Sequence, residues 1–493
     1  IMQFLLGYMF TMKFVIKLFP EITIKSRPVR KQFINQLRRN IKNTLKYADI
    51  VCSVQGQWDA IEVVIENNDQ ELPTRSCMQR IPGIAKILTV KEHNFKTFDD
   101  ILDIAHLAYK NEIAGKSFVV RVKRIGEHDF KSIDVERYVG GGLLQRNPTS
   151  KVQLKKPDYT VKMEIRKQRL LTISAIDEGM GGYPLGCIEG VLSLMSGGFD
   201  STVASHLMSR RGLLTHFVFF NLGGTAHEVG VKQVAHYLWK QYASSHGVKF
   251  VTVPFEGVVA EILKNVDNSQ MGVILKRMML RAASDVAEEL GIESLVTGEC
   301  IAQVSSQTLR NLNVIDAVTD TLVLRPLICM DKPEIINISR KIGAYDFAAR
   351  MPEYCGVISV KPTTRARIEK VEFEEGKFDF TVLQEAVANK KVEHINSVLS
   401  SSDGVLDIEL VQVPDTKDVI IDIRAPQEEE QSPLHLTNNQ IIKIPFYELM
   451  SRLEELPSNN NVLLYCAKGT MSQVHAQQLQ QTGRENIKVF KPS

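Results

Sequence analysis

The chain has no cysteine pair of the kind that binds zinc or cross-links a small domain. Its seven cysteines, at positions 52, 77, 187, 300, 329, 355 and 466, stand singly along 493 residues, without a Cys-x-x-Cys pair. This spacing excludes the common zinc motifs and a disulfide framework, and it indicates free thiols in a reducing compartment. We therefore expect no metal-ligating cluster and a cytoplasmic location.

The chain also lacks an apolar run long enough to cross a bilayer. The opening stretch, residues 1–19, is apolar, but Lys13 and Lys17 interrupt it before it reaches the roughly 20 residues that a spanning helix needs. It has no convincing secretory cleavage site. Met12 and the alternating residues after it are typical of a natural start, so we expect residues 1–11 to be an upstream extension and the protein to make no membrane contact.

Acidic residues are scarce in the first 60 residues, although the formal net charge of the whole chain is only +3. Residues 1–60 carry ten Lys or Arg and three acidic residues, whereas residues 366–430 carry seven basic and sixteen acidic residues. A basic end is typical of polyanion binding, and the acidic stretch indicates a solvated connector. The length exceeds what one hydrophobic core usually organises, so about three domains are expected.

Up to about residue 180 the pattern is α+β, with strands that alternate with amphipathic helices. A basic helix is expected near residues 29–47. Two later strands, SFVVRVKR and YTVKMEIRKQR, carry basic side chains on one polar face, which is either an RNA-contact surface or a solvated charged face. These side chains are Arg121, Lys123, Arg124, Lys162, Arg166 and Lys167.

From about residue 188 short apolar strands alternate with helices, which predicts a parallel sheet. Glycines stand where the strands end, at positions 197, 198, 223, 224 and 298. Ligands bind at this carboxyl edge in open α/β sheets. Residues 367–414 are expected to form an acidic, partly helical linker, and residues 415–493 a small α/β domain.

The clearest motif is SLMSGGFDSTVAS, which places residues 196–201 between an apolar strand and a helix. Its glycines let backbone N–H groups approach an anion, and the hydroxyls and the helix N-terminus add donors. A glycine-rich helix cap is the alternative. The motif is not the GxxxxGKS or GxxxxGKT loop of γ-phosphate hydrolases. It resembles the PP-loop of ATP pyrophosphatases, which holds the β and γ phosphates as leaving pyrophosphate. Asp200 is therefore expected to position phosphate or magnesium rather than to act as a base.

A second loop follows the strand in NVLLYCAKGTMS, with Cys466 at the strand end and Ser472 opening a helix. Backbone N–H groups at a helix N-terminus stabilise a thiolate and make it a nucleophile. With the upstream stretch DVIIDIR, this loop resembles the rhodanese domain, in which such a cysteine carries a persulfide. The alternative is a buried strand cysteine.

These features together resemble the bacterial tRNA 4-thiouridine synthetase family, also called tRNA sulfurtransferases, in its long form with a C-terminal rhodanese domain. The resemblance covers nearly the whole chain from Met12. Further matching motifs are GGGL at 140–143, FFNLGG, MGVILKRMM, TGECIAQVSSQTL, RPLICMDKPEI and MPEYCGVIS. The resemblance implies a multidomain α/β and α+β fold. Its parts are a ferredoxin-like domain at 12–71, a THUMP RNA-binding domain at 72–176, a PP-loop adenylation domain with a doubly wound parallel sheet at 177–366, and a rhodanese domain at 415–493.

The resemblance implies ATP and Mg²⁺ as cofactors, with Lys332 assisting adenylation beside Asp200. The family commonly has a small residue and a glycine where this chain has Cys300 and Ala302. The implied ATP contacts are Leu194, Met195, Ser196, Gly197, Gly198, Asp200, Ser201, Phe219, Phe220, Lys276, Gly298 and Gln307.

The reaction implied by the resemblance is ATP-dependent transfer of persulfide sulfur from Cys466 to uridine 8 of tRNA, through adenylation of the C4 oxygen. Cys355 is the implied disulfide partner of Cys466, attacking either before or after sulfur reaches the uridine. Implied partners are tRNA, an IscS-type cysteine desulfurase, a cellular thiol reductant and, in some bacteria, the sulfur-carrier protein for the thiamine thiazole. Homodimer formation stays open.

Three other interpretations also stay open at this point. One is another PP-loop enzyme, such as an amidotransferase-type synthetase or tRNA-lysidine synthetase, which needs no rhodanese domain. A second is a sulfur-relay carrier with an inactive PP-loop. The third is a noncatalytic RNA-binding module, for which the cysteine loop has no purpose.

Overall fold

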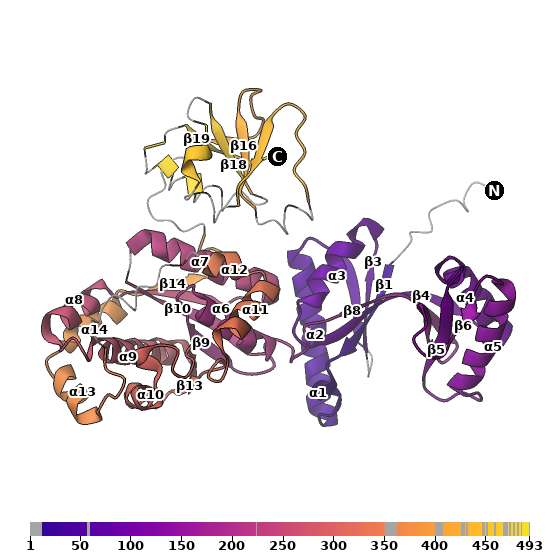
Figure 1. Ribbon diagram of the computed structural model, residues 1–493, viewed down its shortest axis with the longest axis horizontal. Coiled ribbons are helices and arrows are strands. Elements are labelled where there is room, and N and C mark those ends of the chain that lie inside the picture. Colours follow the sequence, from indigo (N-terminus) through magenta and orange to yellow (C-terminus); the bar gives the residue numbers. More distant parts are fainter. Residues whose placement is uncertain are drawn as a thin grey trace. The chain divides into compact units, whose positions relative to one another are not determined.

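The chain folds into two compact units, which are described separately (Figure 1). The first contains residues up to 187 with 210–212, and the second contains the rest. The computed structural model describes residues 12–56, 60–222, 224–349, 351, 362–399, 408–424, 429, 432–445, 449, 452–457, 460–466, 472, 475–476, 479–480, 483–484 and 486–492. The expected extension at residues 1–11 and Cys355 lie outside the described residues.

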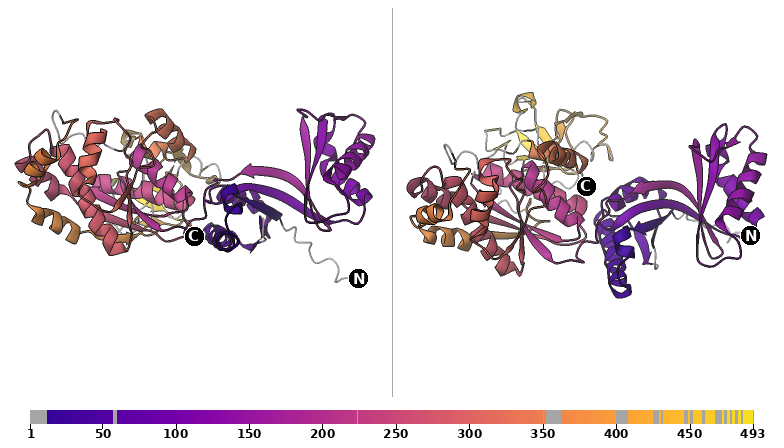
Figure 2. Two further views of the ribbon diagram at one scale, coloured as in Figure 1. Left: turned by 90° about the horizontal axis from the view of Figure 1, so that it is seen from below. Right: turned by 60° about the horizontal axis from the view of Figure 1, so that its bottom comes forward.

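One eight-stranded sheet runs through the first unit, in the order β2-β3-β1-β4-β8-β7-β5-β6. Its central strands β4 (Ile84–Asn94) and β8 (Arg169–Glu178) are long, antiparallel and common to both halves of the unit (Figure 2). The ferredoxin-like half adds β1 (Met12–Leu18), α1 (Pro20–Thr23), α2 (Arg27–Tyr47), β2 (Cys52–Gly56), β3 (Ala60–Ile65), η1 (Asn68–Gln70) and α3 (Glu71–Gln79). The THUMP half adds α4 (Phe98–Ile113), β5 (Ser117–Ile125), α5 (Ser132–Arg146), β6 (Lys151–Val152) and β7 (Tyr159–Arg166).

Tyr109 of α4 supports the point where β7 and β8 stop pairing. Their ladder joins residues 163–166 to 169–172 and ends there. The Tyr109 hydroxyl donates to the carbonyl of Lys162 (2.7 Å) and accepts from the N–H of Ile173 (2.7 Å). Burial raises the pKa of this hydroxyl. The side chain therefore satisfies two backbone groups that leave the ladder inside the hydrophobic core.

The second unit contains a six-stranded sheet in the order β13-β12-β9-β10-β11-β14. All its strand pairs are parallel except that between β11 and β14. The predicted doubly wound parallel sheet is confirmed, with a buried apolar β9 at its centre. The strands are β9 (Gly190–Leu194), β10 (Leu214–Asn221), β11 (Lys249–Pro254), β12 (Ser294–Val296), β13 (Leu322–Leu324) and β14 (Lys391–His394). The helices are α6 (Phe199–Arg210), α7 (Gly224–Tyr242), α8 (Glu256–Asn265), α9 (Met271–Leu290), η2 (Ser305–Gln307), α10 (Leu309–Asp316), α11 (Lys332–Lys341) and α12 (Tyr345–Ala348).

The expected linker at 367–414 is wrong over its first part. Helices α13 (Ile368–Glu375) and α14 (Phe380–Ala388) place Val371 and Leu383 in the core of this domain, and β14 extends its sheet. The acidic residues are not all solvated, since Glu375 is buried and accepts from Nη2 of Arg277 at 2.7 Å. Arg277 lies on α9, almost 100 residues earlier in the chain. The local composition of 367–414 therefore showed only the acidic residues, and it predicted a solvated connector.

The C-terminal domain has a five-stranded parallel sheet in the order β15-β19-β18-β16-β17. Ile420, Leu463 and Phe490 lie in its core. The strands are β15 (Leu410–Val411), β16 (Val419–Asp422), β17 (Gln440–Lys443), β18 (Val462–Tyr465) and β19 (Ile487–Phe490), with η3 (Leu453–Glu455) among the connections. None of the helices in the described parts of the chain is long and apolar enough to cross a membrane.

Candidate active site

The loop between β9 and α6 has the geometry that an anion-binding turn needs. Gly197 adopts φ +82°, which favours glycine. The hydroxyls of Ser196 and Ser201 lie 3.1 Å apart, and the Ser196 N–H donates to the Ser201 hydroxyl (3.2 Å). The N–H of Thr202 donates to the carbonyl of Gly198 (3.2 Å). The predicted loop residues thus gather at the N-terminus of α6, where the helix dipole favours an anion.

Gly298, at the end of β12, touches this helix start. A Cβ atom at Gly298 would lie 2.5 Å from the carbonyl carbon of Asp200 and 2.6 Å from the nitrogen of Ser201. No residue larger than glycine fits without moving the backbone. The structure therefore brings the predicted Gly298 together with the loop from a strand far along the sequence.

Asp200 is held on both carboxylate oxygens. Nζ of Lys332, the first residue of α11, donates to Oδ1 at 2.8 Å, and Nε2 of Gln303 donates to Oδ2 at 2.8 Å. The Lys332 ammonium also lies 5.6 Å from the ring centre of Phe199. Two of the three predicted catalytic side chains in this domain, Asp200 and Lys332, are therefore in contact. Gln303 was not among the predicted residues, although it stands in the motif TGECIAQVSSQTL.

Ala302 sets the direction of Gln303. It has φ +60°, in the left-handed region, and its N–H donates to the carbonyl of Gln307 (2.9 Å). An alanine there is strained by about 1 kcal/mol. A glycine would adopt this conformation without that strain.

Lys276 belongs to a charged network around Glu299, which stands in the loop that follows β12. Its ammonium donates to the buried Glu299 at 2.6 Å, and Arg325 donates to the same carboxylate at 2.8 Å. Arg325 also pairs with Asp316. Burial acts to raise the pKa of Glu299, but the two cations outweigh it and lower the pKa. Glu299 thus keeps its charge and holds the predicted Lys276 in place. Glu299 itself was not among the predicted residues.

The remaining predicted ATP contacts are of two kinds. Gln307 is buried, and its Oε1 has no hydrogen-bond partner within the described residues. The side chains of Met195, Phe219 and Phe220 are buried. Phe220 packs in the domain core against Phe255, with 4.7 Å between the ring centroids. Leu194 ends β9 and packs against the same core. Met195, Phe219 and Phe220 can therefore offer a ligand their backbone, whereas the side chain of Leu194 is partly exposed.

His227 of α7 was also not predicted. Its ring lies edge-on to Phe219 with centroids 4.9 Å apart, and Nε2 lies 3.4 Å from the carbonyl oxygen of Ser196. Burial lowers its pKa, so the ring is neutral at neutral pH. A histidine next to the phosphate loop is recognisable only in the fold, because the sequence separates it from the loop by β10.

Cys466 follows β18 and is buried. Its Sγ accepts hydrogen bonds from the N–H of Ser472 (3.4 Å) and from the Ser472 hydroxyl (3.0 Å). Two donors aimed at one sulfur stabilise negative charge on it. The predicted loop cysteine therefore has the surroundings of a nucleophile or persulfide carrier, and not those of an apolar core thiol.

The DIR stretch lies beside this cysteine. Strands β16 and β18 pair in parallel with Asp422 opposite Tyr465, the residue before Cys466. Arg424 donates to both oxygens of Asp422 (2.9 and 2.6 Å) and lies 4.9 Å from the centre of the Tyr465 ring. The ion pair thus stands at the same carboxyl edge of the sheet as the cysteine loop.

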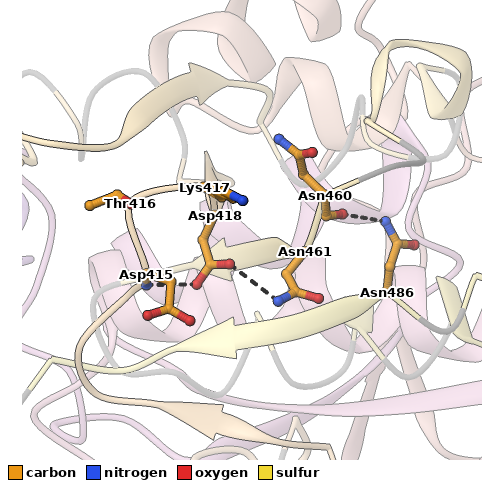
Figure 3. A pocket seen from close by; sticks show the side chains of 7 residues that line it. All are labelled: Asp415, Thr416, Lys417, Asp418, Asn460, Asn461 and Asn486. Atoms are coloured by element: carbon orange, nitrogen blue, oxygen red, sulfur yellow. Dashed lines mark hydrogen bonds between the residues drawn. The ribbon is translucent and has the colours of Figure 1, made fainter.

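A polar pocket lies at the opposite, amino edge of this sheet (Figure 3). Its side chains mainly tie loops together: Nδ2 of Asn461 donates to Asp418 (3.2 Å), and Nδ2 of Asn486 donates to the carbonyl of Asn460 (2.7 Å). The lining residues are Asp415, Thr416, Lys417, Asp418, Asn460, Asn461 and Asn486. These residues precede β16, β18 and β19, whereas Cys466 follows β18 at the other edge of the parallel sheet. The pocket therefore takes no part in the chemistry of that thiol.

The predicted RNA-contact residues differ in their exposure to solvent. Arg121, Lys123, Lys162 and Lys167 are exposed, and β5 and β7 place Arg121 directly beside Lys162. Arg124 is half-buried and lies over the ring of Phe130.

Arg166 is buried, so its prediction as a surface contact is wrong. Its Nε donates to Glu164 at 2.6 Å, and Lys17 of β1 pairs with the same carboxylate. The carboxylates of Glu164 and of Glu62, which lies on β3 far back in the sequence, compensate the charge of this arginine inside the unit.

The phosphate loop after β9 and the cysteine loop after β18 define a PP-loop enzyme with a rhodanese-like domain on the same chain. Residues 186–380 match the family model described as thiamine biosynthesis protein (ThiI), and residues 13–87 match the ThiI ferredoxin-like domain. Residues 95–174 match the THUMP domain and residues 408–492 the rhodanese-like domain.

Whole-chain relatives point the same way. A tRNA sulfurtransferase from Marinobacter nauticus is 51% identical over 483 residues, and one from Shewanella pealeana is 52% identical over 485 residues. Each alignment covers 98% of this chain and 100% of the relative. The crystal structure of a 4-thiouridine synthetase with RNA and ATP superposes with a TM-score of 0.68 at 26% identity, covering 78% of this chain and 99% of that one.

The chain belongs to the tRNA sulfurtransferase family, and it is an enzyme of that class. Of the interpretations left open above, this excludes a different PP-loop synthetase and a noncatalytic RNA-binding module.

Proposed function

We propose that the chain transfers persulfide sulfur to uridine 8 of tRNA in an ATP-dependent reaction that gives 4-thiouridine. The observation that carries the proposal is the presence, on one chain, of a phosphate loop with Lys332 bound to Asp200 and of a sulfur-carrying loop with Ser472 donating to Cys466. The phosphate loop can activate an oxygen of the substrate, and the cysteine loop can supply the sulfur that replaces this oxygen.

ATP binds, in this proposal, with its phosphates on the N–H groups and hydroxyls of residues 196–201. Gln307, Lys276 and Gly298 complete the site. The solved 4-thiouridine synthetase that resembles this chain has ATP bound, which supports the assignment.

Mg²⁺ would be held by Asp200 together with the phosphates of ATP. Among the described residues no group of three or more His, Cys, Asp or Glu side chains could hold a metal ion alone. A single carboxylate plus substrate phosphates is an ordinary arrangement for this hard cation. When bound, the ion neutralises phosphate charge.

Adenylation begins when the C4 oxygen of the uridine attacks the α-phosphorus of ATP. The bond from that phosphorus to the bridging oxygen breaks, pyrophosphate leaves, and the N3 proton of the uracil is released. Lys332 stabilises the charge that develops on the transferring and leaving phosphates, because its ammonium is already fixed on Asp200 beside the loop. The C4 oxygen then departs as part of AMP.

Sulfur transfer uses Cys466 loaded as a persulfide by a cysteine desulfurase of the IscS type. On one route the terminal sulfur attacks C4 and AMP leaves; Cys355 then attacks the Cys466 sulfur and breaks its bond to the transferred sulfur. On the other route Cys355 attacks the Cys466 sulfur first, and the released sulfide attacks C4 as AMP leaves. On both routes Cys355 and Cys466 end as a disulfide, which two electrons from a cellular thiol reductant return to thiols.

The exposed residues Arg121, Lys123, Lys162 and Lys167 bind tRNA phosphates in this proposal. Affinity is then expected to fall steeply with salt. The proposed division of the chain keeps a ferredoxin-like domain at 12–71 and a THUMP domain at 72–176, which share strands of one sheet. Homodimer formation and a cytoplasmic location are further parts of the proposal.

A second function is sulfur donation to the sulfur-carrier protein for the thiamine thiazole. The family model that matches residues 186–380 carries a thiamine biosynthesis description, and this favours it.

Mass spectrometry of tRNA from a deletion strain tests the main proposal. Loss of 4-thiouridine, with return on expression of this chain, is the expected result. Unchanged 4-thiouridine in the deletion strain would contradict the proposed reaction, and thiamine auxotrophy of the same strain would support the second function.

A further inference from the structure

Gln303 holds one of the two carboxylate oxygens of Asp200. Its Nε2 donates to Oδ2 at 2.8 Å, while Nζ of Lys332 donates to Oδ1, also at 2.8 Å. A carboxylate accepts hydrogen bonds and does not donate them, so the amide nitrogen of Gln303 must face it. Two donors on different oxygens restrict the rotation of the carboxylate about its bond to Cβ. The directions of its remaining lone pairs are therefore fixed as well.

The loop that carries Gln303 is itself held on both sides of this residue. On one side the N–H of Ala302 donates to the carbonyl of Gln307 at 2.9 Å. On the other side the buried Asn311 donates through Nδ2 to the carbonyl of Ser305 at 2.8 Å. Gln303 is an exposed residue, and an exposed side chain on a loose loop would sample many directions. On this fixed loop its amide needs little further ordering to keep one direction.

We propose that Gln303 is a positioning residue for adenylation, which holds Asp200 and, through it, Lys332 beside the transferring phosphates. The inference rests on the proposed function, because it assigns a role within the adenylation step. Glutamine suits this place because its amide is a neutral donor, which holds a carboxylate without cancelling its negative charge. The charge of Asp200 thus remains to fix the ammonium of Lys332.

Loss of this donor leaves Asp200 with Lys332 as its partner on one oxygen alone. The carboxylate can then turn, and the ammonium bonded to Oδ1 moves with it. Charges that are fixed in advance lose much of their effect on a reaction when they are displaced. In the proposed function the phosphates of ATP bind to N–H groups and hydroxyls of residues 196–201, which are separate from the Gln303 amide. Gln303 should therefore affect the rate of adenylation more than the affinity for ATP.

Two variants of the full chain distinguish a hydrogen-bond donor from a side chain that only fills space. Gln303→Met keeps the length of the side chain and removes the donor. Gln303→Glu keeps the shape of the side chain and places a like charge opposite Oδ2 of Asp200. Because Gln303 is exposed, both variants are expected to fold. The same two substitutions at Gln384, an exposed residue of α14, are the matched controls.

The measurement is the rate of tRNA-dependent pyrophosphate release in a single turnover, with the ATP concentration varied, at a pH of about 8, at which glutamate is ionised. We expect the maximum rate to fall by about 10-fold in Gln303→Met and by about 100-fold in Gln303→Glu, because repulsion displaces the carboxylate further than the loss of one partner does. The half-saturating ATP concentration should stay within about 3-fold of the wild type in both variants. Gln384→Met and Gln384→Glu should match the wild type in both quantities.

Three results would overturn the inference. Wild-type maximum rates in both Gln303 variants would show that adenylation does not depend on the contact with Asp200. Equal falls in Gln303→Met and Gln303→Glu would assign the side chain a packing role. A higher half-saturating ATP concentration with an unchanged maximum rate would make Gln303 an ATP contact. Absence of tRNA-dependent pyrophosphate release in the wild type would instead refute the proposed function itself, and the inference with it, before any variant is compared.

Discussion

Lys332 and Asp200 are joined by a hydrogen bond of 2.8 Å at the first turn of α6, although 132 residues separate them in the chain. Asp331 caps α11 by accepting from the N–H of Glu334, and this cap fixes the helix whose first residue is Lys332. The ammonium is therefore placed beside the phosphate loop before any ligand binds. Charges that are fixed in advance are the main means by which phosphoryl and nucleotidyl transfer is accelerated.

Lys332→Ala is expected to lower tRNA-dependent pyrophosphate release by about 100-fold, the usual effect of losing one preorganised donor to a developing charge. Lys341→Ala, at the exposed other end of α11, is the matched control and should leave the rate unchanged. The assay follows pyrophosphate with saturating ATP and tRNA. A Lys332→Ala rate within twofold of the wild type would remove this lysine from adenylation.

Ala302→Gly is expected to raise the free energy of unfolding of the PP-loop domain by up to about 1 kcal/mol, because it relieves the left-handed backbone at φ +60°. Ala317→Gly, at φ −61°, is the control and should lower stability. Urea unfolding followed by fluorescence of Trp239, in a Trp58→Phe background, reports this domain. A loss of stability in Ala302→Gly as large as that in the control would contradict the prediction.

Tyr109→Phe is expected to destabilise the first unit by about 1–3 kcal/mol. The substitution removes the hydroxyl that forms hydrogen bonds with the buried carbonyl of Lys162 and the buried N–H of Ile173. Amide hydrogen exchange at Ile173 measures the effect directly and should speed up. Tyr138→Phe removes a hydroxyl that bonds to Asp99 at the surface and should change stability by less than about 0.5 kcal/mol. Equal protection of Ile173 in wild type and Tyr109→Phe would be inconsistent with this role.

His216 makes the PP-loop domain sensitive to acid. Burial, helped by the charge of Lys249, lowers the pKa of His216 from 6.5 to about 4, and its Nδ1 already accepts the N–H of Lys249 at 3.0 Å. Between these pH values the unfolded chain binds a proton that the folded domain does not bind. This contribution to stability is therefore complete above pH 6.5 and is lost as the pH falls towards 4.

His216→Asn keeps an acceptor for Lys249 but does not titrate. Between pH 7 and pH 5 the variant is expected to lose about 1–2 kcal/mol less stability than the wild type, allowing for partial solvent screening. Trp239 fluorescence in urea at both pH values measures the difference. An identical loss in the two proteins would show that His216 does not carry the acid sensitivity.

The local sequence was sufficient to predict the positions of the two loops, because the phosphate loop and the cysteine loop are each built from consecutive residues. It placed residues 196–201 at the start of α6 and Cys466 at the end of β18. Sequence could not place the partners that complete them. Gln303 reaches Asp200 from 103 residues away, and only the left-handed turn at Ala302 aims it there.

Charge was the least reliable signal, because its meaning depends on partners from distant elements. Arg166 was expected at an RNA-contact surface, yet Glu164 and Glu62 hold it inside the first unit. Glu375 was expected in a solvated linker, yet Arg277 holds it in the core of the PP-loop domain. In both cases a compensating ion, Glu62 of β3 or Arg277 of α9, lies on an element that only the tertiary fold brings near.

The central claim is that the chain adenylates the uridine at one site and carries sulfur at another. Purified Cys466→Ser, supplied with tRNA, ATP, cysteine and a cysteine desulfurase, tests it most directly when pyrophosphate and 4-thiouridine are measured in the same reaction. The account predicts that pyrophosphate release with tRNA stays within about threefold of the wild type while 4-thiouridine falls by at least about 100-fold, because the nucleophile that carries the sulfur is gone. Wild-type levels of 4-thiouridine from Cys466→Ser would contradict it.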